Sequence, residues 1–295
     1  MEKKSGRKIA DGILFGCAAL LCAAVLFFFG IRRPEIIFPA MNGEKPQMLF
    51  LGDSNIDFSF GGTEIPTMFE EKTGYVVYNA AIGGTCAANT KPYITNTNYY
   101  TLLSFFNITK MIEAGDFSAI TRNRDMINES NSDLFEKHTI LSHLDYSVMD
   151  YVVIHYGLND YYCGTPIEGG DSYDENTYEG ALRTGIERVH KTCPEATIIL
   201  SSITYTRYET GDGGTESGYS LDFGGGTIEK YRDGMKKIAE EYPYTVFLDN
   251  LSGMGIGDDN YSEEGYFHDA MHFDEKGREI YTEGLVDLIE SLKEE

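Results

Sequence analysis

The sequence is short of basic residues. Its 295 residues include 24 Lys and Arg against 47 Asp and Glu, and residues 34–295 alone carry 18 basic and 45 acidic side chains, a net charge of −27. Nucleic acids and anionic lipid surfaces are bound through patches of Lys and Arg. The composition therefore argues against both as ligands of this region, and we expect no nucleic-acid partner.

Cysteine is also scarce, and its arrangement excludes two kinds of site. Cys17 and Cys22 lie in an apolar run, where we interpret them as packing residues, and Cys86, Cys163 and Cys193 follow at irregular spacing. An odd number of cysteines at such spacing predicts no disulfide framework, and the lack of a Cys-x-x-Cys pair gives no indication of zinc. We expect neither a metal nor a cofactor. No long unit recurs, which argues against a solenoid.

One long apolar run is present near the N-terminus. Residues 12–31 carry no charge, four basic residues precede them, and Arg32 and Arg33 follow. Twenty residues of helix rise about 30 Å, the thickness of the hydrocarbon core. No Ala-x-Ala cleavage site follows, so a cleaved signal peptide is the weaker alternative. We expect residues 1–33 to be a cytoplasmic tail and a transmembrane signal anchor, with the rest of the chain extracytoplasmic at the cell membrane.

After a linker at 34–46, apolar runs alternate with amphipathic stretches. Short apolar runs predict buried strands near 47–52, 75–80, 150–156, 196–203 and 245–248. Apolar residues at helical spacing predict helices near 62–73, 177–193, 227–241 and 275–292, the last capped by Asp274. This alternation indicates a parallel sheet covered on both faces. We therefore expect residues 47–295 to form an α/β domain with five mainly parallel strands.

Two segments interrupt this alternation. Residues 85–148 hold three amphipathic patterns, near 101–114, 116–128 and 132–144, and predict a mostly helical insertion. A long insertion between core strands usually lies over the sheet edge that carries a ligand site. Residues 209–226 are rich in glycine and lack a phosphate-loop lysine, so we interpret them as a mobile surface loop.

Four short motifs combine residue types suited to acyl transfer. Gly52-Asp53-Ser54-Asn55 ends the first predicted strand and places a serine at the sheet edge where α/β proteins bind ligands. Gly83-Gly84 follows the second, and glycines let a backbone N–H approach a ligand. Gly157-Leu158-Asn159-Asp160 follows the third and offers a side-chain amide. Asp269-Ala270-Met271-His272 precedes the last helix and can pair a carboxylate with an imidazole.

Alone, each motif also fits an ordinary turn or cap. Other candidate groups lack the matching placement, namely Asp57, His143, His155 and His268.

In this order, the four motifs resemble the SGNH hydrolases, also called GDSL lipases and esterases, over about residues 47–292. The resemblance implies a three-layer α/β/α, flavodoxin-like fold and ester hydrolysis without a metal. It implies that Ser54 is the nucleophile, His272 the general base and Asp269 the residue that orients it. It also implies an oxyanion hole made by the backbone N–H groups of Ser54 and Gly84 and the side chain of Asn159.

The sequence departs from the family pattern in two places. Asn55 stands where leucine is usual, and the interval between Gly84 and Asn159 is longer than usual, which leaves the substrate class open. Cys86 and Cys163 follow the second and third motifs closely, so a disulfide between them is a hypothesis.

The resemblance and the predicted anchor together suggest a membrane-anchored, extracytoplasmic serine esterase. Its substrate would be an O-acyl ester on a carbohydrate or lipid, with the O-acetyl groups of a cell-surface or dietary glycan as the first candidate. Five tyrosines near the motifs are candidates to stack on sugar rings, although packing is the favoured explanation in a chain with 21 tyrosines: Tyr93, Tyr99, Tyr100, Tyr161 and Tyr162.

Three alternatives stay open at this point. An acyltransferase of envelope polymers would use the same serine and the same first half-reaction. A lysophospholipase or thioesterase would need an apolar groove, for which the insertion offers Leu102, Leu103, Phe105, Phe106, Ile108 and Met111. A binding protein without activity ranks last, because every catalytic group that the family needs is present.

Overall fold

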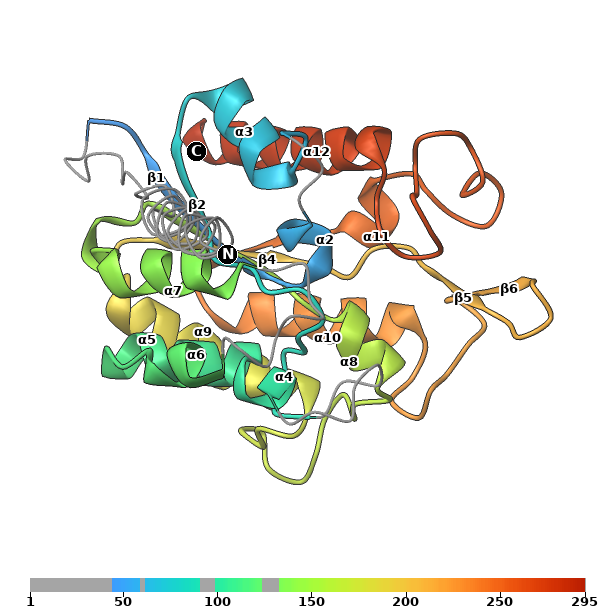
Figure 1. Ribbon diagram of the computed structural model, residues 1–295, viewed down its shortest axis with the longest axis horizontal. Helices are drawn as coiled ribbons and strands as arrows, with labels where there is room; N and C mark the ends of the chain where they lie inside the picture. Colours follow the sequence, from blue (N-terminus) through green and yellow to red (C-terminus); the bar gives the residue numbers. More distant parts are fainter. Residues whose placement is uncertain (1–43, 59–61, 91–98, 124–132, 295) are drawn as a thin grey trace, which may run out of the picture. The chain divides into compact units, whose positions relative to one another are not determined.

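A computed structural model describes residues 44–58, 62–90, 99–123 and 133–294 (Figure 1). Its central sheet has the strand order β2-β1-β3-β4-β7. The strands are β1 (Gln47–Gly52), β2 (Val76–Asn79), β3 (Tyr151–His155), β4 (Thr197–Ser201) and β7 (Thr245–Leu248). Every pairing between them is parallel, which confirms the predicted α/β class and its five-stranded sheet.

The inner strands are apolar along their length because helices cover both faces of the sheet. Every residue of β1 is buried, and β3 and β4 each bury all but their first residue. A sheet with one face in water would instead alternate apolar and polar residues along each strand. Helices α3 (Ile65–Thr73) and α12 (Glu275–Lys293) lie over one face, and α9 (Tyr178–Thr192) and α10 (Ile228–Glu241) over the other (Figure 1).

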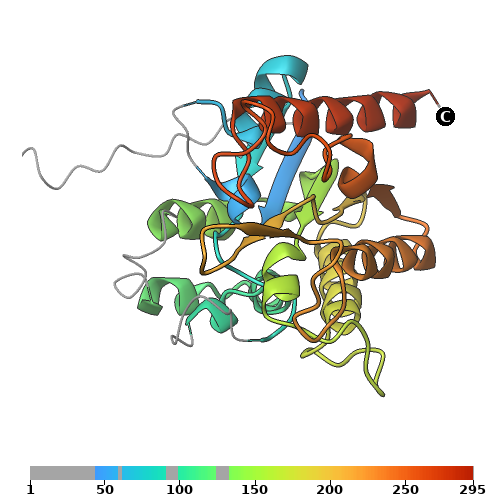
Figure 2. The ribbon, with the colours of Figure 1, turned by 90° about the vertical axis from the view of Figure 1, so that its right-hand side faces the viewer.

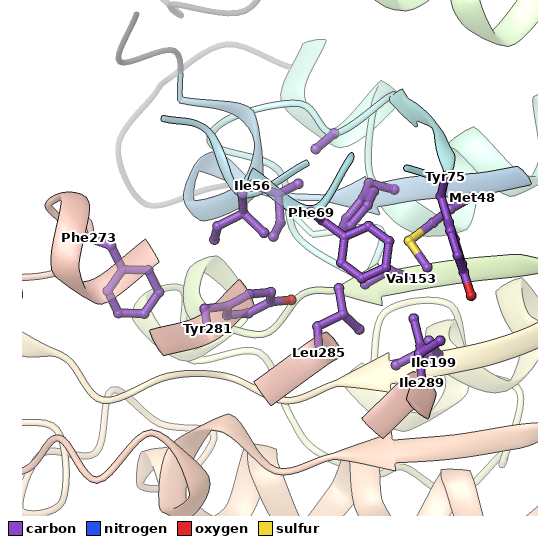
Figure 3. Packing of buried hydrophobic residues seen from close by; sticks show 13 residues of the cluster. Met48, Ile56, Phe69, Tyr75, Val153, Ile199, Phe273, Tyr281, Leu285 and Ile289 are labelled. Atoms are coloured by element: carbon purple, nitrogen blue, oxygen red, sulfur yellow. The ribbon is translucent and has the colours of Figure 1, made fainter. Parts of the chain in front are cut away.

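Helix α12 illustrates how the sequence pattern produces this packing. Tyr281, Leu285 and Ile289 recur every fourth residue and share a buried cluster with Val153 and Ile199 of the sheet (Figure 3). Side chains four residues apart lie on the same face of a helix, so the stripe faces the strands. The helix begins where predicted, because the carboxylate of Asp274 accepts the N–H of Glu275 at 2.9 Å.

The described part of the long stretch between β2 and β3 is helical. It contains α4 (Tyr99–Leu102), α5 (Phe105–Ala114), α6 (Ser118–Asn123), α7 (Leu134–His143) and the 3₁₀ helix η2 (Tyr146–Val148). Helix α5 packs on α9, where Gly185 is required because the ring of Phe105 occupies the space of a Cβ. The long helices of this region therefore belong to the packed body of the domain.

The prediction of a plain surface loop at 209–226 is wrong at its start. The antiparallel strands β5 (Arg207–Glu209) and β6 (Thr215–Ser217) form a hairpin there. The guanidinium of Arg207 holds it together, donating from Nε to Oγ1 of Thr215 at 2.7 Å and from Nη2 to its carbonyl oxygen at 2.8 Å. Strands this short show no alternation of apolar and polar residues, which is why the pattern missed them.

Three further short helices begin just beyond the carboxyl ends of strands. They are α2 (Ser54–Asp57) after β1, α8 (Leu158–Tyr162) after β3 and α11 (Asn250–Gly253) after β7. Figure 2 looks onto this edge of the sheet, where the β5–β6 hairpin also lies. The chain runs from β1 outward to β2 and then returns to β3 on the other side of β1. Ligands of open α/β sheets bind at such a reversal of strand order.

The predicted membrane anchor falls where nothing is described. Residues 12–31, with Cys17 and Cys22, lie outside the described ranges, as do Tyr93 and most of the predicted linker. Within the described ranges, no helix has both the length and the apolar character needed to cross a bilayer.

Candidate active site

Ser54 stands at a sharp turn between β1 and α2. Gly52 ends the strand at a point where a Cβ would lie 3.0 Å from the carbonyl oxygen of His155. Asp53 then caps α2, accepting the N–H of Asn55 through Oδ1 at 3.1 Å. The chain therefore leaves the sheet abruptly at its carboxyl edge, and Ser54 keeps 8% of its surface exposed.

A line of hydrogen bonds joins Ser54 to the loop before α12. The hydroxyl of Ser54 lies 2.9 Å from Nε2 of His272, and Nδ1 of His272 lies 2.7 Å from Oδ2 of Asp269. The carboxylate places the ring proton on Nδ1, so Nε2 is left to accept the proton of Ser54. The ring of Phe58 packs edge-on against His272 at a centroid separation of 4.4 Å and restricts its rotation.

Asp269 is held as an anion. Partial burial raises the pKa of its carboxyl, but hydrogen bonds from the His272 ring and from the backbone N–H groups of Met271 and His272 outweigh this and lower it to about 2. The two backbone donors reach Oδ1 at 2.8 and 2.7 Å. One oxygen of the carboxylate thus fixes the turn while the other fixes the imidazole, which explains why the two residues stand three apart in the sequence.

The predicted oxyanion donors come from three neighbouring segments. Gly84 has a φ of +76°, a conformation that glycine adopts most readily, and Asn159 is the second residue of α8. Nδ2 of Asn159 donates to the carbonyl oxygen of Thr85 at 3.0 Å, so the second and third motifs touch. Among the described residues, neither the N–H of Ser54 nor that of Gly84 donates a hydrogen bond. These are the two backbone groups that were predicted to face the oxyanion.

Backbone and carboxylate contacts hold the Gly84 loop in place. The N–H of Ile82 donates to the carbonyl oxygen of Gly52 at 2.9 Å. The carboxylate of Asp160 accepts the N–H groups of Ala87 and Ala88 at 2.7 and 3.0 Å. Burial raises the pKa of Asp160 to about 6 in spite of these two donors. Asp160 was not among the predicted site residues, although its place beside Asn159 was a usable signal.

The remaining histidines do not approach Ser54 in this way. His155 is buried at the end of β3, with Nδ1 3.2 Å from Oγ of Ser201, and burial lowers its pKa to about 4. It is a neutral core residue. His143 lies on the exposed side of α7. His268 contributes a backbone N–H to the carbonyl oxygen of His272 at 2.8 Å, while the imidazole of His272 meets the serine.

Two of the tyrosines proposed to stack on sugars are placed in the interior. Tyr161 is fully buried and Tyr162 is 5% exposed. The hydroxyl of Tyr162 is bonded to Oγ1 of Thr206 at 2.7 Å and donates to the carbonyl oxygen of Arg207 at 2.8 Å. Both rings pack in the aromatic cluster around Phe223, so neither presents a face to a ligand.

The hypothesised disulfide is absent from this structure. Cys86 and Cys163 are both reduced, and their Sγ atoms lie 3.8 Å apart, well beyond the roughly 2 Å of a disulfide bond. The contact with Cys163 and burial both raise the pKa of the Cys86 thiol. Cys193 is a third free thiol, also buried. Within the described ranges, no group of His, Cys, Asp and Glu is arranged to hold a metal ion.

Comparison with known proteins agrees with the family resemblance of the motifs and with the observed fold. A family model described as "GDSL-like Lipase/Acylhydrolase family" matches residues 50–280. A solved structure described as a possible lipase from Chitinophaga pinensis aligns with a TM-score of 0.53 at 17% identity, covering 84% of this chain and 98% of that one. A protein from Lactobacillus plantarum aligns with a TM-score of 0.54 at 15% identity, covering 84% and 97%. At these identities the two structures support the fold alone. No curated protein matches the chain significantly.

Proposed function

The chain belongs to the GDSL-like lipase/acylhydrolase family, and from that premise we propose that it is a serine esterase that hydrolyses O-acyl esters at Ser54. The observation that carries the proposal is the line of contacts from the Ser54 hydroxyl through His272 to Asp269, at 2.9 and 2.7 Å. A serine bonded to an imidazole that a carboxylate orients is the arrangement that activates a hydroxyl nucleophile.

In the proposed reaction, Oγ of Ser54 attacks the ester carbonyl while Nε2 of His272 takes the hydroxyl proton. The N–H groups of Ser54 and Gly84 and the amide of Asn159 stabilise the oxyanion. The imidazolium then protonates the departing alkoxide, so an alcohol leaves and the acyl group stays on Ser54. Water attacks the acyl-serine, His272 accepts its proton and returns it to Oγ, and the carboxylic acid departs.

The oxyanion role of Asn159 makes a separate prediction. Replacing Asn159 with Ala should lower kcat about 10²- to 10³-fold with little change in KM, because the donor acts mainly on the developing charge. Steady-state kinetics with a nitrophenyl ester, normalised to the fraction of enzyme that a fluorophosphonate labels, measure the effect. The thermal midpoint should fall only slightly, since the contact with Thr85 is one hydrogen bond. A kcat within about threefold of the parent would remove Asn159 from the oxyanion hole.

We further propose that the acyl group is short, with acetyl as the first candidate. The alternative of a lysophospholipase or thioesterase would need a groove for a long chain, lined by the apolar residues of the insertion. Those residues are occupied elsewhere: Phe105 packs against α9, and the guanidinium of Arg188 lies 4.5 Å above the ring of Phe106. Leu103, Ile108 and Met111 are buried as well, and Leu102 alone of the six is exposed, at 43%.

Acyl-length preference tests this proposal. On a series of nitrophenyl esters from two to twelve carbons, we expect kcat/KM to be highest at acetyl and to fall at least about tenfold by eight carbons. Longer chains gain no burial and would collide with the packed helices. A maximum at eight carbons or more would replace the short-chain proposal with a lipase-like one. Product analysis with and without a glycan acceptor separates a hydrolase from an acyltransferase, since both form the same acyl-serine.

The cellular setting is also a proposal. The uncharged run at 12–31 and the basic residues before it support a membrane-anchored enzyme whose catalytic domain is extracytoplasmic, where glycan esters are the available substrates. If this setting is correct, the protein should stay with the membrane fraction after carbonate washing. Deletion of residues 1–33 should release it.

A further inference from the structure

A buried ion pair joins the helical segment to the helix that begins at Ser54. Nζ of Lys137, on α7, lies 2.8 Å from Oδ1 of Asp57, the last residue of α2, and the two side chains are only 5% and 4% exposed. Lysine is almost never buried without a partner, since removing its charge from water is costly. Lys137 is the one buried lysine in the described part of the chain.

Both partners also contact the loop that carries the proposed oxyanion donor. Oδ2 of Asp57 accepts the N–H of Gly83 at 2.8 Å, directly before Gly84. Nζ of Lys137 donates to the carbonyl oxygen of Asn79 at 3.1 Å, at the end of β2. The Lys137–Asp57 ion pair therefore connects α7 and α2 with the end of β2 and with the loop that carries Gly84.

The side chain of Asn79 adds two hydrogen bonds that also connect α2 with the Gly84 loop. Its Nδ2 donates to the carbonyl oxygen of Ile56 at 3.3 Å, and its Oδ1 accepts the N–H of Ala81 at 3.1 Å. The helix that starts at the nucleophile and the loop that ends at Gly84 are thus tied by several contacts. Of these, the bond to Gly83 is the one nearest the oxyanion donor, and it depends on how the Asp57 carboxylate is oriented.

We propose that Lys137 is a positioning residue for ester hydrolysis, acting through Asp57 and Gly83 to aim the N–H of Gly84 at the oxyanion. The inference rests on the proposed serine esterase activity. Lys137 holds one oxygen of Asp57, and this leaves the other oxygen directed at Gly83. When the cation is removed, the carboxylate loses the charge of Lys137 that holds it in this orientation. Its hydrogen bond to the N–H of Gly83 then weakens, and the oxyanion donor moves. Helix α7 is, in this view, a functional part of the site.

The test compares Lys137→Met with the parent enzyme by kcat per active site. The concentration of active sites is titrated with a fluorophosphonate, so that loss of folded protein does not count as loss of rate. We expect kcat per site to fall about tenfold or more, with KM changed less than about threefold. The affinity for a trifluoromethyl ketone, which forms an oxyanion on Ser54, should fall in parallel with kcat. The matched control is Lys72→Met, which removes the exposed ion pair between Lys72 and Glu283 and should change neither quantity.

A second variant keeps the proposal falsifiable if Lys137→Met does not fold. Lys137→Met combined with Asp57→Ala removes both charges and the acceptor for Gly83, so no unpaired charge remains buried. Its kcat per site should also fall about tenfold or more. Parental kcat per site and parental ketone affinity in whichever variant folds would overturn the positioning role. If the parent enzyme neither takes the fluorophosphonate nor turns over esters, the proposed function fails instead, and the two failures are thereby distinguished.

Discussion

Replacing Ser54 with Ala should reduce the hydrolysis of a short nitrophenyl ester by about 10⁴-fold or more. The substitution removes the only atom that would carry the acyl group, and no other described serine lies within hydrogen-bond reach of the His272 imidazole. Residual turnover should come from binding and from the oxyanion donors alone. The rate is measured at saturating substrate on protein purified to exclude contaminating esterases.

The fold should survive this substitution, which makes the loss of rate interpretable. Ser54 is small and contributes one side-chain hydrogen bond, to His272, so the free energy of unfolding should change by about 1 kcal/mol. Ser142→Ala, on the exposed side of α7, is the matched control and should keep the parental rate. Labelling by a fluorophosphonate should map to Ser54 and vanish in the variant. A Ser54→Ala enzyme with more than about a tenth of the parental rate would exclude this serine as nucleophile.

Replacing His272 with Ala should cost nearly as much, about 10⁴- to 10⁶-fold in kcat. The imidazole takes the serine proton and returns it to the leaving group, so both half-reactions lose their proton carrier. The double variant of Ser54 and His272 should be no slower than either single one, because the two residues act as one unit. Asp269→Asn should cost about 10⁴-fold, at the low end of this range, since Asp269 orients the ring and stabilises its charge without carrying the proton.

His268 provides the sharpest control for this assignment. It lies four residues before His272, in the same loop, and its backbone N–H bonds to the carbonyl oxygen of His272. His268→Ala should leave kcat within about threefold of the parent, because this hydrogen bond to His272 is made by the backbone, which the substitution keeps. If His268→Ala and His272→Ala lost comparable activity, the assignment of the general base would have to be withdrawn.

The main sheet and Ser54 were predictable because they depend on short-range patterns. A continuous apolar run is required of any strand buried on both faces, and β1, β3 and β4 show such runs. Parallel strands end at one common edge, so motifs that follow successive strands come together whatever lies between them in the chain. That rule places the serine, glycine and asparagine motifs side by side without knowledge of any contact.

Other features could not be predicted from the sequence, because they depend on which residues pack against each side chain in the fold. The apolar stripe of α5 shows that one of its faces is covered, and whether protein or a ligand covers it is decided by the packing of Phe105 against α9. For Tyr161 and Tyr162 the sequence favoured packing but left a sugar platform open, and the structure buries both. The positions of Cys86 and Cys163 in the sequence were compatible with a disulfide. In the structure the two thiols are in contact but are not joined by a disulfide bond.

By itself, the sequence determined which residue types stand at the strand ends and in what order, and these suit the proposed ester hydrolysis. Periodicity and strand-end placement are local properties, and a single chain displays them directly. The tertiary structure alone decided that Lys137 is joined to Asp57, 80 positions earlier, and it brought the predicted His272 within 2.9 Å of the Ser54 hydroxyl. Such contacts depend on the packing of distant segments, which no local pattern encodes, and they determine whether the groups present at the site are also held in place.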